Sequence, residues 1–126
     1  MRKDIISTDK APEAIGAYVQ AVNSHGILFI SGQLGFNMPD GHLSETLEEQ
    51  TLNAVKNLEC IMKAAGSDKS KVLKTTIFLT DMENFEKVNK IYEAFFEGQY
   101  PARSCVAVKE LPKMAKVEIE CMVATD

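Results

Sequence analysis

The chain has little of what marks secreted, membrane-spanning or nucleic-acid-binding proteins. No segment approaches the roughly 20 consecutive apolar residues that a membrane-spanning helix needs, and residues 1–7 lack the apolar stretch of a signal peptide. Lysine and arginine number 14 against 18 acidic residues, so the net charge is −4 and the overall attraction for nucleic acid or an anionic membrane is missing. We therefore expect a cytoplasmic protein that binds neither nucleic acid nor membranes.

Cysteine and histidine are also scarce. The three cysteines, Cys60, Cys105 and Cys121, are an odd number at wide spacing, which is neither a disulfide framework nor a zinc-ligand pattern. The two histidines, His25 and His42, stand in separate glycine-flanked turns and are interpreted as surface residues. The sequence thus predicts a protein of a reducing compartment that uses no metal and no cofactor.

What the chain does have is an ordinary globular composition and clear periodicity. Its 126 residues, 45% hydrophobic and 25% charged, predict one domain over residues 1–126. Apolar residues recur at helical spacing after Thr46, where Glu49 completes a capping box and Gly66 is placed to end the helix. We expect helices at 46–65 and 84–97, and strands at 18–22, 27–31, 72–80, 104–108 and 116–124.

This order predicts an α+β domain with one mixed sheet and both helices on a single face. The other face must then meet water or another subunit. In the last strand Val117, Ile119, Cys121 and Val123 point one way and Glu118 and Glu120 the other. The second face therefore mixes small, sulfur-bearing and charged residues, which is typical of a subunit interface, and we expect a homo-oligomer.

Arg103 is the main candidate for binding chemistry. Apart from Arg2 at the terminus it is the only arginine in a chain whose other basic residues are lysines, and it follows Pro101 and Ala102 at the head of a strand. A guanidinium binds a carboxylate through two parallel hydrogen bonds and stays charged when partly desolvated, whereas an ammonium does neither well. The alternative is a surface ion pair with a nearby glutamate.

Glu118 and Glu120 are candidates for holding water and passing a proton. They share a face with Arg103 if both final strands turn their valines to the core, and spacing alone does not decide which of the two lies nearer to it. A solvated strand face is the alternative for both. Cys105 lies two residues beyond Arg103, and without an obvious base it is interpreted as a packing residue that lines a pocket rather than a nucleophile.

Four further residues could line a binding site. Ser31 and Gly32 close the second strand, where glycine permits close approach of the backbone to a ligand. Tyr18 could offer a hydroxyl at a pocket rim, although a half-buried strand aromatic is the simpler interpretation. Asn89 falls one residue off the apolar stripe of the second helix, where a solvated side chain is ordinary.

Five local motifs occur in order along nearly the whole chain. They read APEAIGAYVQ at 11–20, ISGQ at 30–33, VNKIYEAFF at 88–96, YPARSCV at 100–106, and LPK followed by KVEIE within 111–120. Together they resemble the Rid (YjgF-type) reactive-intermediate deaminases. The pairing of Pro-Ala-Arg-Ser with a later Val-Glu-Ile-Glu is the specific part of the signal, since Ser-Gly-Gln alone is common.

The resemblance implies a fold, an assembly and an activity. The fold is chorismate-mutase-like: a homotrimer with a central barrel of sheets, helices outside, and active sites between subunits. The activity is hydrolysis of 2-iminobutanoate and 2-iminopropanoate to 2-oxo acids and ammonia, without a cofactor. Rival interpretations are a non-catalytic metabolite-binding or regulatory trimer, and an RNA-directed activity, against which the net charge and the lack of an aromatic-basic surface speak.

The resemblance also implies roles for single residues. Arg103 matches the carboxylate-binding arginine and Glu118 the glutamate that positions the attacking water, which favours Glu118 over Glu120. Tyr18, Ser31, Asn89 and Cys105 match cleft-lining positions, Cys105 through its main chain. The chain departs from the family pattern at Ala17, where proline is common, at Leu34–Phe36, where Ile-Pro is usual, and at Met114, where a smaller or polar residue is usual. These departures leave the preferred side chain of the substrate open.

Overall fold

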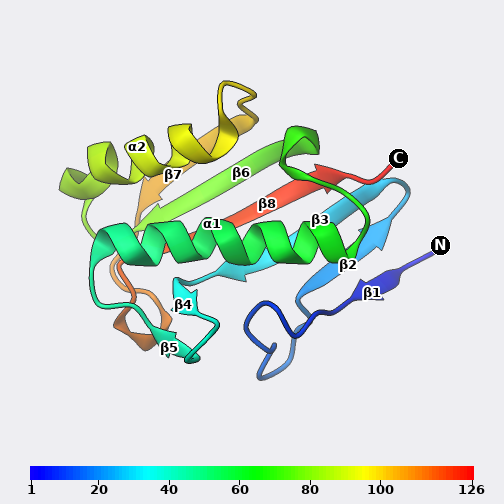
Figure 1. Cartoon of the computed structure of the whole chain (residues 1–126), viewed down its shortest axis with the longest axis horizontal. Coiled ribbons are helices and arrows are strands. Elements are labelled where there is room, and N and C mark those ends of the chain that lie inside the picture. The colour runs from blue at the N-terminus through cyan, green and yellow to red at the C-terminus, as the bar shows by residue number, and fades with distance from the viewer.

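All 126 residues are described by the structure, a computed structural model, in which helices and a sheet form two layers (Figure 1). The main sheet has six strands in the spatial order β1 (Asp4–Ile6), β2 (Ala21–Ser24), β3 (Ile27–Gln33), β8 (Val117–Ala124), β6 (Val72–Leu79) and β7 (Ala102–Ala107). Neighbours are antiparallel except β6 and β7, which are parallel. The predicted mixed sheet is thereby confirmed.

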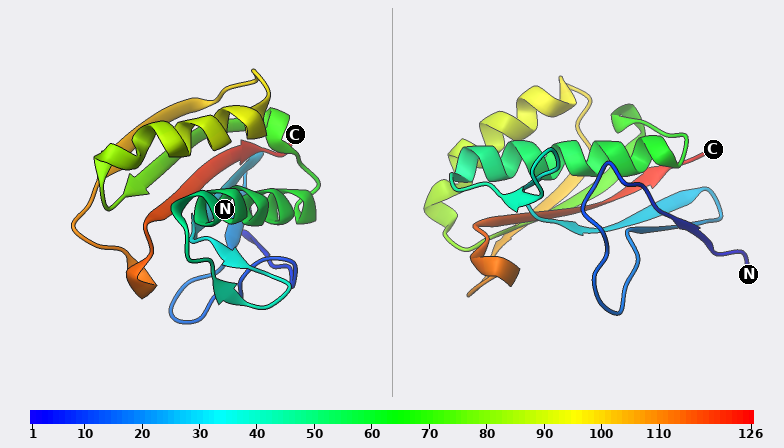
Figure 2. Two further views of the ribbon diagram at one scale, coloured as in Figure 1. Left: turned by 60° about the vertical axis from the view of Figure 1, so that its left-hand side comes forward. Right: turned by 60° about the horizontal axis from the view of Figure 1, so that its bottom comes forward.

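Both long helices, α1 (Leu47–Ala64) and α2 (Phe85–Phe96), lie on the same face of this sheet, as predicted (Figure 2). The smaller elements are the hairpin of β4 (Phe36–Asn37) and β5 (His42–Leu43) and the 3-10 turns η1 (Lys69–Lys71), η2 (Met82–Asn84) and η3 (Pro112–Met114). The α1 helix begins where its cap predicts, because Thr46 Oγ1 accepts a hydrogen bond from Glu49 N at 3.1 Å. No helix of the chain has the length and apolar character needed to cross a membrane.

The core lies between the helices and the inner face of the sheet. The alternation of β8 holds as predicted, since Val117, Ile119 and Val123 are completely buried. Such side chains supply the main driving force for folding, about 1.5–3 kcal/mol each relative to exposure. The one buried polar pair that links the layers is Thr75 on β6 with Tyr92 on α2, whose hydroxyl oxygens lie 2.7 Å apart.

The N-terminal third differs from the prediction. The strand expected at 18–22 begins only at Ala21, and Tyr18 lies in the preceding loop with 53% of its surface exposed. Gln20 explains this loop: its buried carboxamide accepts from Thr8 N at 2.7 Å and donates to Thr8 O at 3.0 Å and Pro12 O at 2.7 Å. These bonds satisfy the backbone of a turn in place of a strand partner. The short β1 strand, which pairs with β2, was not predicted.

The expected shared face of Arg103 and the two glutamates is wrong within one chain. Arg103 is paired in register with Thr75, whose side chain is buried beneath the helices, whereas Glu118 is paired with Phe78 on the uncovered face. The β8 strand turns its valines inward, but β7 turns Val106 outward, where it is 43% exposed. The condition on which the prediction depended is therefore met by only one of the two strands.

Val106 of β7 joins other apolar side chains on the uncovered face of the sheet. This face carries exposed large apolar side chains from four strands, namely Phe29, Leu73, Val106 and Met122, each 40–47% exposed. Neither long helix lies on this face of the sheet (Figure 2). Exposed apolar groups gathered on one face are typical of a surface that contacts another protein.

Candidate active site

The candidate residues gather in two places on opposite faces of the sheet. Tyr18, Ser31, Gly32 and Glu118 line one cavity of about 850 Å³, which we call the cleft. Asn89, Arg103 and Cys105 lie at the other place, beside the aromatic rings of α2, which we call the arginine shelf. The structure thus places the predicted residues in two separate groups and not in one site.

Ser31 connects the cleft to the Tyr18 loop. A bulge between Ile30 and Gln33 interrupts the pairing of β3 with β8 at this point. The Ser31 hydroxyl donates to Val19 O at 2.7 Å, and its amide donates to Gln20 O at 2.9 Å. Ser31 therefore holds the loop on which Tyr18 reaches the cleft, in addition to lining it.

Gly32 makes room for the carboxylate of Glu118. A Cβ atom at position 32 would overlap Glu118 Oε2, so only glycine lets the carboxylate lie against β3. The Glu118 side chain is half-buried there, and this burial raises the pKa of Glu118, with a further upward contribution from the charge of Glu120. A carboxyl group with a raised pKa exchanges protons more readily near neutral pH than an ordinary glutamate.

The rest of the cleft lining contains both acidic and apolar side chains. Glu13 and Glu120 join Glu118, and Lys113 is the only basic side chain in the lining. The apolar residues of the lining are mainly those of the segment after β3 and of the Tyr18 loop: Leu34, Phe36, Met38 and Ile15. Glu13 and Lys113 were not predicted as cleft residues, because Glu13 lies in a loop and Lys113 in a short 3-10 turn, neither of which has a periodic apolar pattern.

The arginine shelf holds the Arg103 guanidinium between a polar and an aromatic contact. Arg103 Nη1 donates to Asn89 Oδ1 at 2.6 Å, and Asn89 Nδ2 donates in turn to Glu93 Oε1 at 3.0 Å. The guanidinium carbon lies 5.0 Å from the ring centre of Tyr92 and 5.3 Å from that of Phe85. These contacts fix the plane of the group and leave most of its five N–H donors free for a ligand.

Arg103 forms no ion pair with a carboxylate, so the alternative of a surface salt bridge is wrong in this structure. Asn89 is likewise not simply solvated, because it contacts Arg103 directly. Cys105 is half-buried beside them, and burial raises the pKa of its thiol more than the Arg103 charge lowers it. A neutral thiol is a poor nucleophile, which agrees with a packing role for Cys105.

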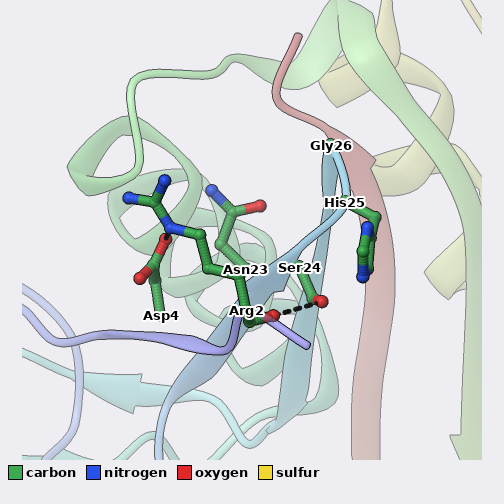
Figure 3. A pocket seen from close by; sticks show the side chains of 6 residues that line it. All are labelled: Arg2, Asp4, Asn23, Ser24, His25 and Gly26. Atoms are coloured by element: carbon green, nitrogen blue, oxygen red, sulfur yellow. Dashed lines mark hydrogen bonds and ion pairs between the residues drawn. The ribbon is translucent and has the colours of Figure 1, made fainter.

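A third hollow lies away from both places. Its six lining residues come from the N-terminus and the β2–β3 turn and include His25 and the salt-bridged pair of Arg2 and Asp4, whose closest atoms are 2.9 Å apart (Figure 3). None of the candidate residues is among them. No three histidine, cysteine, aspartate or glutamate side chains in the chain are placed to hold one metal ion.

The chain is similar in sequence to known proteins along nearly its whole length. Residues 8–125 match the family model described as endoribonuclease L-PSP. The chain is 45% identical to the 2-iminobutanoate/2-iminopropanoate deaminase of Rattus norvegicus over 95% of this chain and 88% of that one. It is 46% identical to the chloroplastic reactive intermediate deaminase A of Arabidopsis thaliana over 97% of its length, and spans 66% of that longer protein.

The fold is similarly represented among solved structures. A crystal structure of Escherichia coli TdcF with bound serine superposes with a TM-score of 0.93 at 37% identity, over 98% of this chain and 99% of that one. The likeness therefore extends over the whole fold described above, including the strands and loops that carry the cleft and the arginine shelf.

Proposed function

This chain belongs to the endoribonuclease L-PSP family, which includes the Rid reactive-intermediate deaminases, and on that premise we propose that it hydrolyses 2-imino acids to 2-oxo acids and ammonia. Its substrates in this proposal are 2-iminobutanoate and 2-iminopropanoate. The observation that carries the proposal is a glutamate with a raised pKa in a cleft and an arginine whose guanidinium is oriented but not paired. We further propose that residues 1–126 act as one domain, and in the cytoplasm, where three free thiols suit a reducing environment.

The proposed reaction needs positioning and proton transfer. Arg103 binds the substrate carboxylate, and Glu118 accepts a proton from the water that attacks the C=N carbon of the protonated imine. The resulting carbinolamine carries a hydroxyl and an amine on one carbon. Glu118 returns its proton to the amine nitrogen. As the C–N bond then breaks, the hydroxyl gives its proton to Glu118 and becomes the carbonyl of the 2-oxo acid, and ammonia leaves. General acid–base transfer of this kind typically contributes roughly 10²- to 10⁴-fold, and orientation adds to it.

For one site to use both residues, two copies of the chain must meet. Arg103 and Glu118 face opposite sides of the sheet in a single chain, and the uncovered face carries the exposed apolar side chains of Phe29, Leu73, Val106 and Met122. We therefore propose that the cleft of one subunit receives the arginine shelf of its neighbour, and that the assembly is the homotrimer that the resemblance to the Rid proteins implies. Tyr18, Ser31 and Gly32 belong to the first half of this site, and Asn89 and Cys105 to the second.

Mixing two inactive variants tests the composite site. Arg103→Ala keeps Glu118, and Glu118→Gln keeps Arg103. If the site lies between subunits, unfolding and refolding the two variants together at equal amounts restores about a quarter of the wild-type activity, because about a quarter of randomly formed sites pair two intact halves. If each chain carries a whole site, the mixture stays as inactive as the two variants separately, and the proposal fails.

The reaction itself is tested by making 2-iminobutanoate in situ and following its decay. The wild type must accelerate the decay beyond the uncatalysed rate. Glu118→Gln keeps the size and polarity of the side chain but not its proton transfer, so we expect turnover to fall with little change in binding. A variant that loses only affinity would contradict the role given to Glu118.

The two rival functions predict other results. In a metabolite-binding or regulatory trimer, 2-oxo acids bind but the imine decays at its uncatalysed rate. An RNA-directed activity, which the family description mentions, requires a surface that attracts phosphates. The cleft instead carries Glu13, Glu118 and Glu120 against one lysine, and the chain has a net charge of −4. Salt-dependent RNA binding by the purified protein would favour the RNA-directed alternative.

A further inference from the structure

The apolar part of the cleft lining is larger than a methyl or ethyl group requires. Leu34, Phe36, Met38 and Ile15 line it together with Tyr18. The side chains of 2-iminopropanoate and 2-iminobutanoate are a methyl and an ethyl group. Apolar surface in a binding cleft contributes to the binding free energy when a ligand covers it, and the two small side chains would leave most of this surface uncovered.

The position of this apolar wall is fixed by the backbone. Gly35 lies so close to α1 that a Cβ atom there would overlap the main chain of Gln50. The side chains on either side of it, Leu34 and Phe36, line the cleft. The amide of Asn57, a buried residue of α1, donates to Leu34 O at 3.3 Å and to Phe36 O at 3.1 Å, which holds the segment against the helix.

The wall and the glutamate therefore belong to one preformed cavity. Leu34, Phe36 and Glu118 all line it, and Leu34 is two residues beyond Gly32, which makes room for the Glu118 carboxylate. A wall that is held in place before the ligand binds selects for shape at a lower entropic cost than a flexible one.

From this arrangement we infer that the cleft selects 2-imino acids with branched, thioether or aromatic side chains, such as those formed from leucine, methionine and phenylalanine, over those with a methyl or ethyl group. The inference rests on the proposed function and adds the substrate class to it. The substrate carboxylate binds at the arginine shelf, the imine carbon lies at Glu118, and the side chain covers Leu34 and Phe36.

The test is a series of imines made in situ by an amino-acid oxidase from alanine, 2-aminobutyrate, leucine, methionine and phenylalanine. Semicarbazide competes with the protein for each imine, so the protein-dependent loss of semicarbazone gives kcat/KM for each side chain. Because one methylene in an apolar pocket changes kcat/KM by about 10-fold or more, we expect the leucine-derived imine to exceed the alanine-derived one at least about 10-fold.

Phe36→Ala and Leu34→Ala then locate the selectivity. Each should lower the ratio of kcat/KM for the leucine-derived to the alanine-derived imine by several-fold or more. A general loss of folded protein lowers both values and leaves this ratio unchanged. Leu52→Ala is the matched control: Leu52 is a 44% exposed leucine on α1 outside the cleft, and its replacement should leave the ratio as in the wild type.

The outcomes separate the two proposals. If the alanine-derived and 2-aminobutyrate-derived imines are hydrolysed as fast as the larger ones or faster, or if Phe36→Ala and Leu34→Ala leave the ratio unchanged, the inference on side-chain selection is wrong and the proposed reaction stands. If no imine in the series is hydrolysed faster than in the absence of the protein, the proposed function itself is wrong and the inference falls with it.

Discussion

Replacing Arg103 gives the sharpest test of how the arginine shelf binds a carboxylate. One guanidinium nitrogen is already bonded to Asn89 Oδ1 at 2.6 Å, and the planar group lies about 5 Å from two aromatic ring centres. Two N–H groups that remain free can bind both oxygens of a carboxylate. Hydrogen bonds to charged groups contribute about 1.5–3 kcal/mol each, so Arg103→Ala should cost at least about 3 kcal/mol.

Because each 1.36 kcal/mol changes a rate constant about tenfold, this loss corresponds to roughly a 10²-fold lower kcat/KM. Arg103→Lys keeps the charge but offers a compact ammonium without the planar fork, so we expect it to lose about half of that free energy, roughly tenfold. The same order should appear in the affinity for 2-oxobutanoate measured by calorimetry, since the product retains the carboxylate. If Arg103→Ala falls less than about twofold in both measurements, the carboxylate binds elsewhere.

Asn89 completes the test as a double-mutant cycle. Asn89→Ala removes the bond to Nη1 and frees the guanidinium to rotate, which should cost about 1 kcal/mol, or roughly a fivefold lower kcat/KM. In the Arg103→Ala background the same change should cost almost nothing, because Asn89 acts only through the guanidinium. Equal costs in both backgrounds would show that Asn89 contacts the substrate independently.

Three further changes test the cleft and its surroundings. Gly32→Ala should fold with wild-type stability but displace the Glu118 carboxylate and lower kcat about 10²-fold. In Gly35→Ala the new methyl group meets the backbone of Gln50, so this variant should lose about 1–3 kcal/mol of unfolding free energy. Equal thermal stability of the two variants would contradict this contrast. Glu120→Gln removes the charge that helps to raise the pKa of Glu118, so the acidic limb of the kcat/KM profile should move to lower pH, and an unmoved or upward-moving limb would refute the coupling. Met114→Gly should raise the free energy of unfolding by up to about 1 kcal/mol, because Met114 is 92% exposed and its φ of 56° is strained for a residue that has a side chain. A lower free energy of unfolding in chemical denaturation would rule out backbone strain at this turn.

Periodicity predicted the elements that bury one face and missed those that do not. The α1 and α2 helices and strands β3, β6, β7 and β8 appear within a few residues of their predicted bounds, because each has an apolar pattern of clear period. The β1 strand and the β4–β5 hairpin are two or three residues long, too short for a period to show. The strand predicted at 18–22 includes Tyr18, which the structure places in a loop. The side chain of Gln20 folds this loop, and hydrogen bonds of a side chain leave no periodic pattern in the sequence.

The sequence named candidate residues for the site but did not place them in the fold. The scarcity of arginine pointed to Arg103, and the family motifs pointed to Glu118, yet their faces could not be read from alternation alone. Alternation says which residues of a strand share a face, but not which face is covered by helices. The valines of β8 face the core, whereas Val106 of β7 faces outward, because both faces of this sheet carry apolar side chains.

The single parallel pair in the sheet has a bearing on how the chain folds. Thr75, Asn89 and Arg103 all belong to the continuous unit β6-α2-β7, so the arginine shelf is built from contacts that are close in sequence. Gly32 and Glu118, by contrast, lie on strands separated by both helices, and they meet only when β8 pairs with β3. Pairing across such a long loop is entropically costly and slow. During folding the carboxylate anchor can therefore form while the cleft is still open, and recovery of turnover after dilution from denaturant cannot precede the closure of the longest loop in the chain.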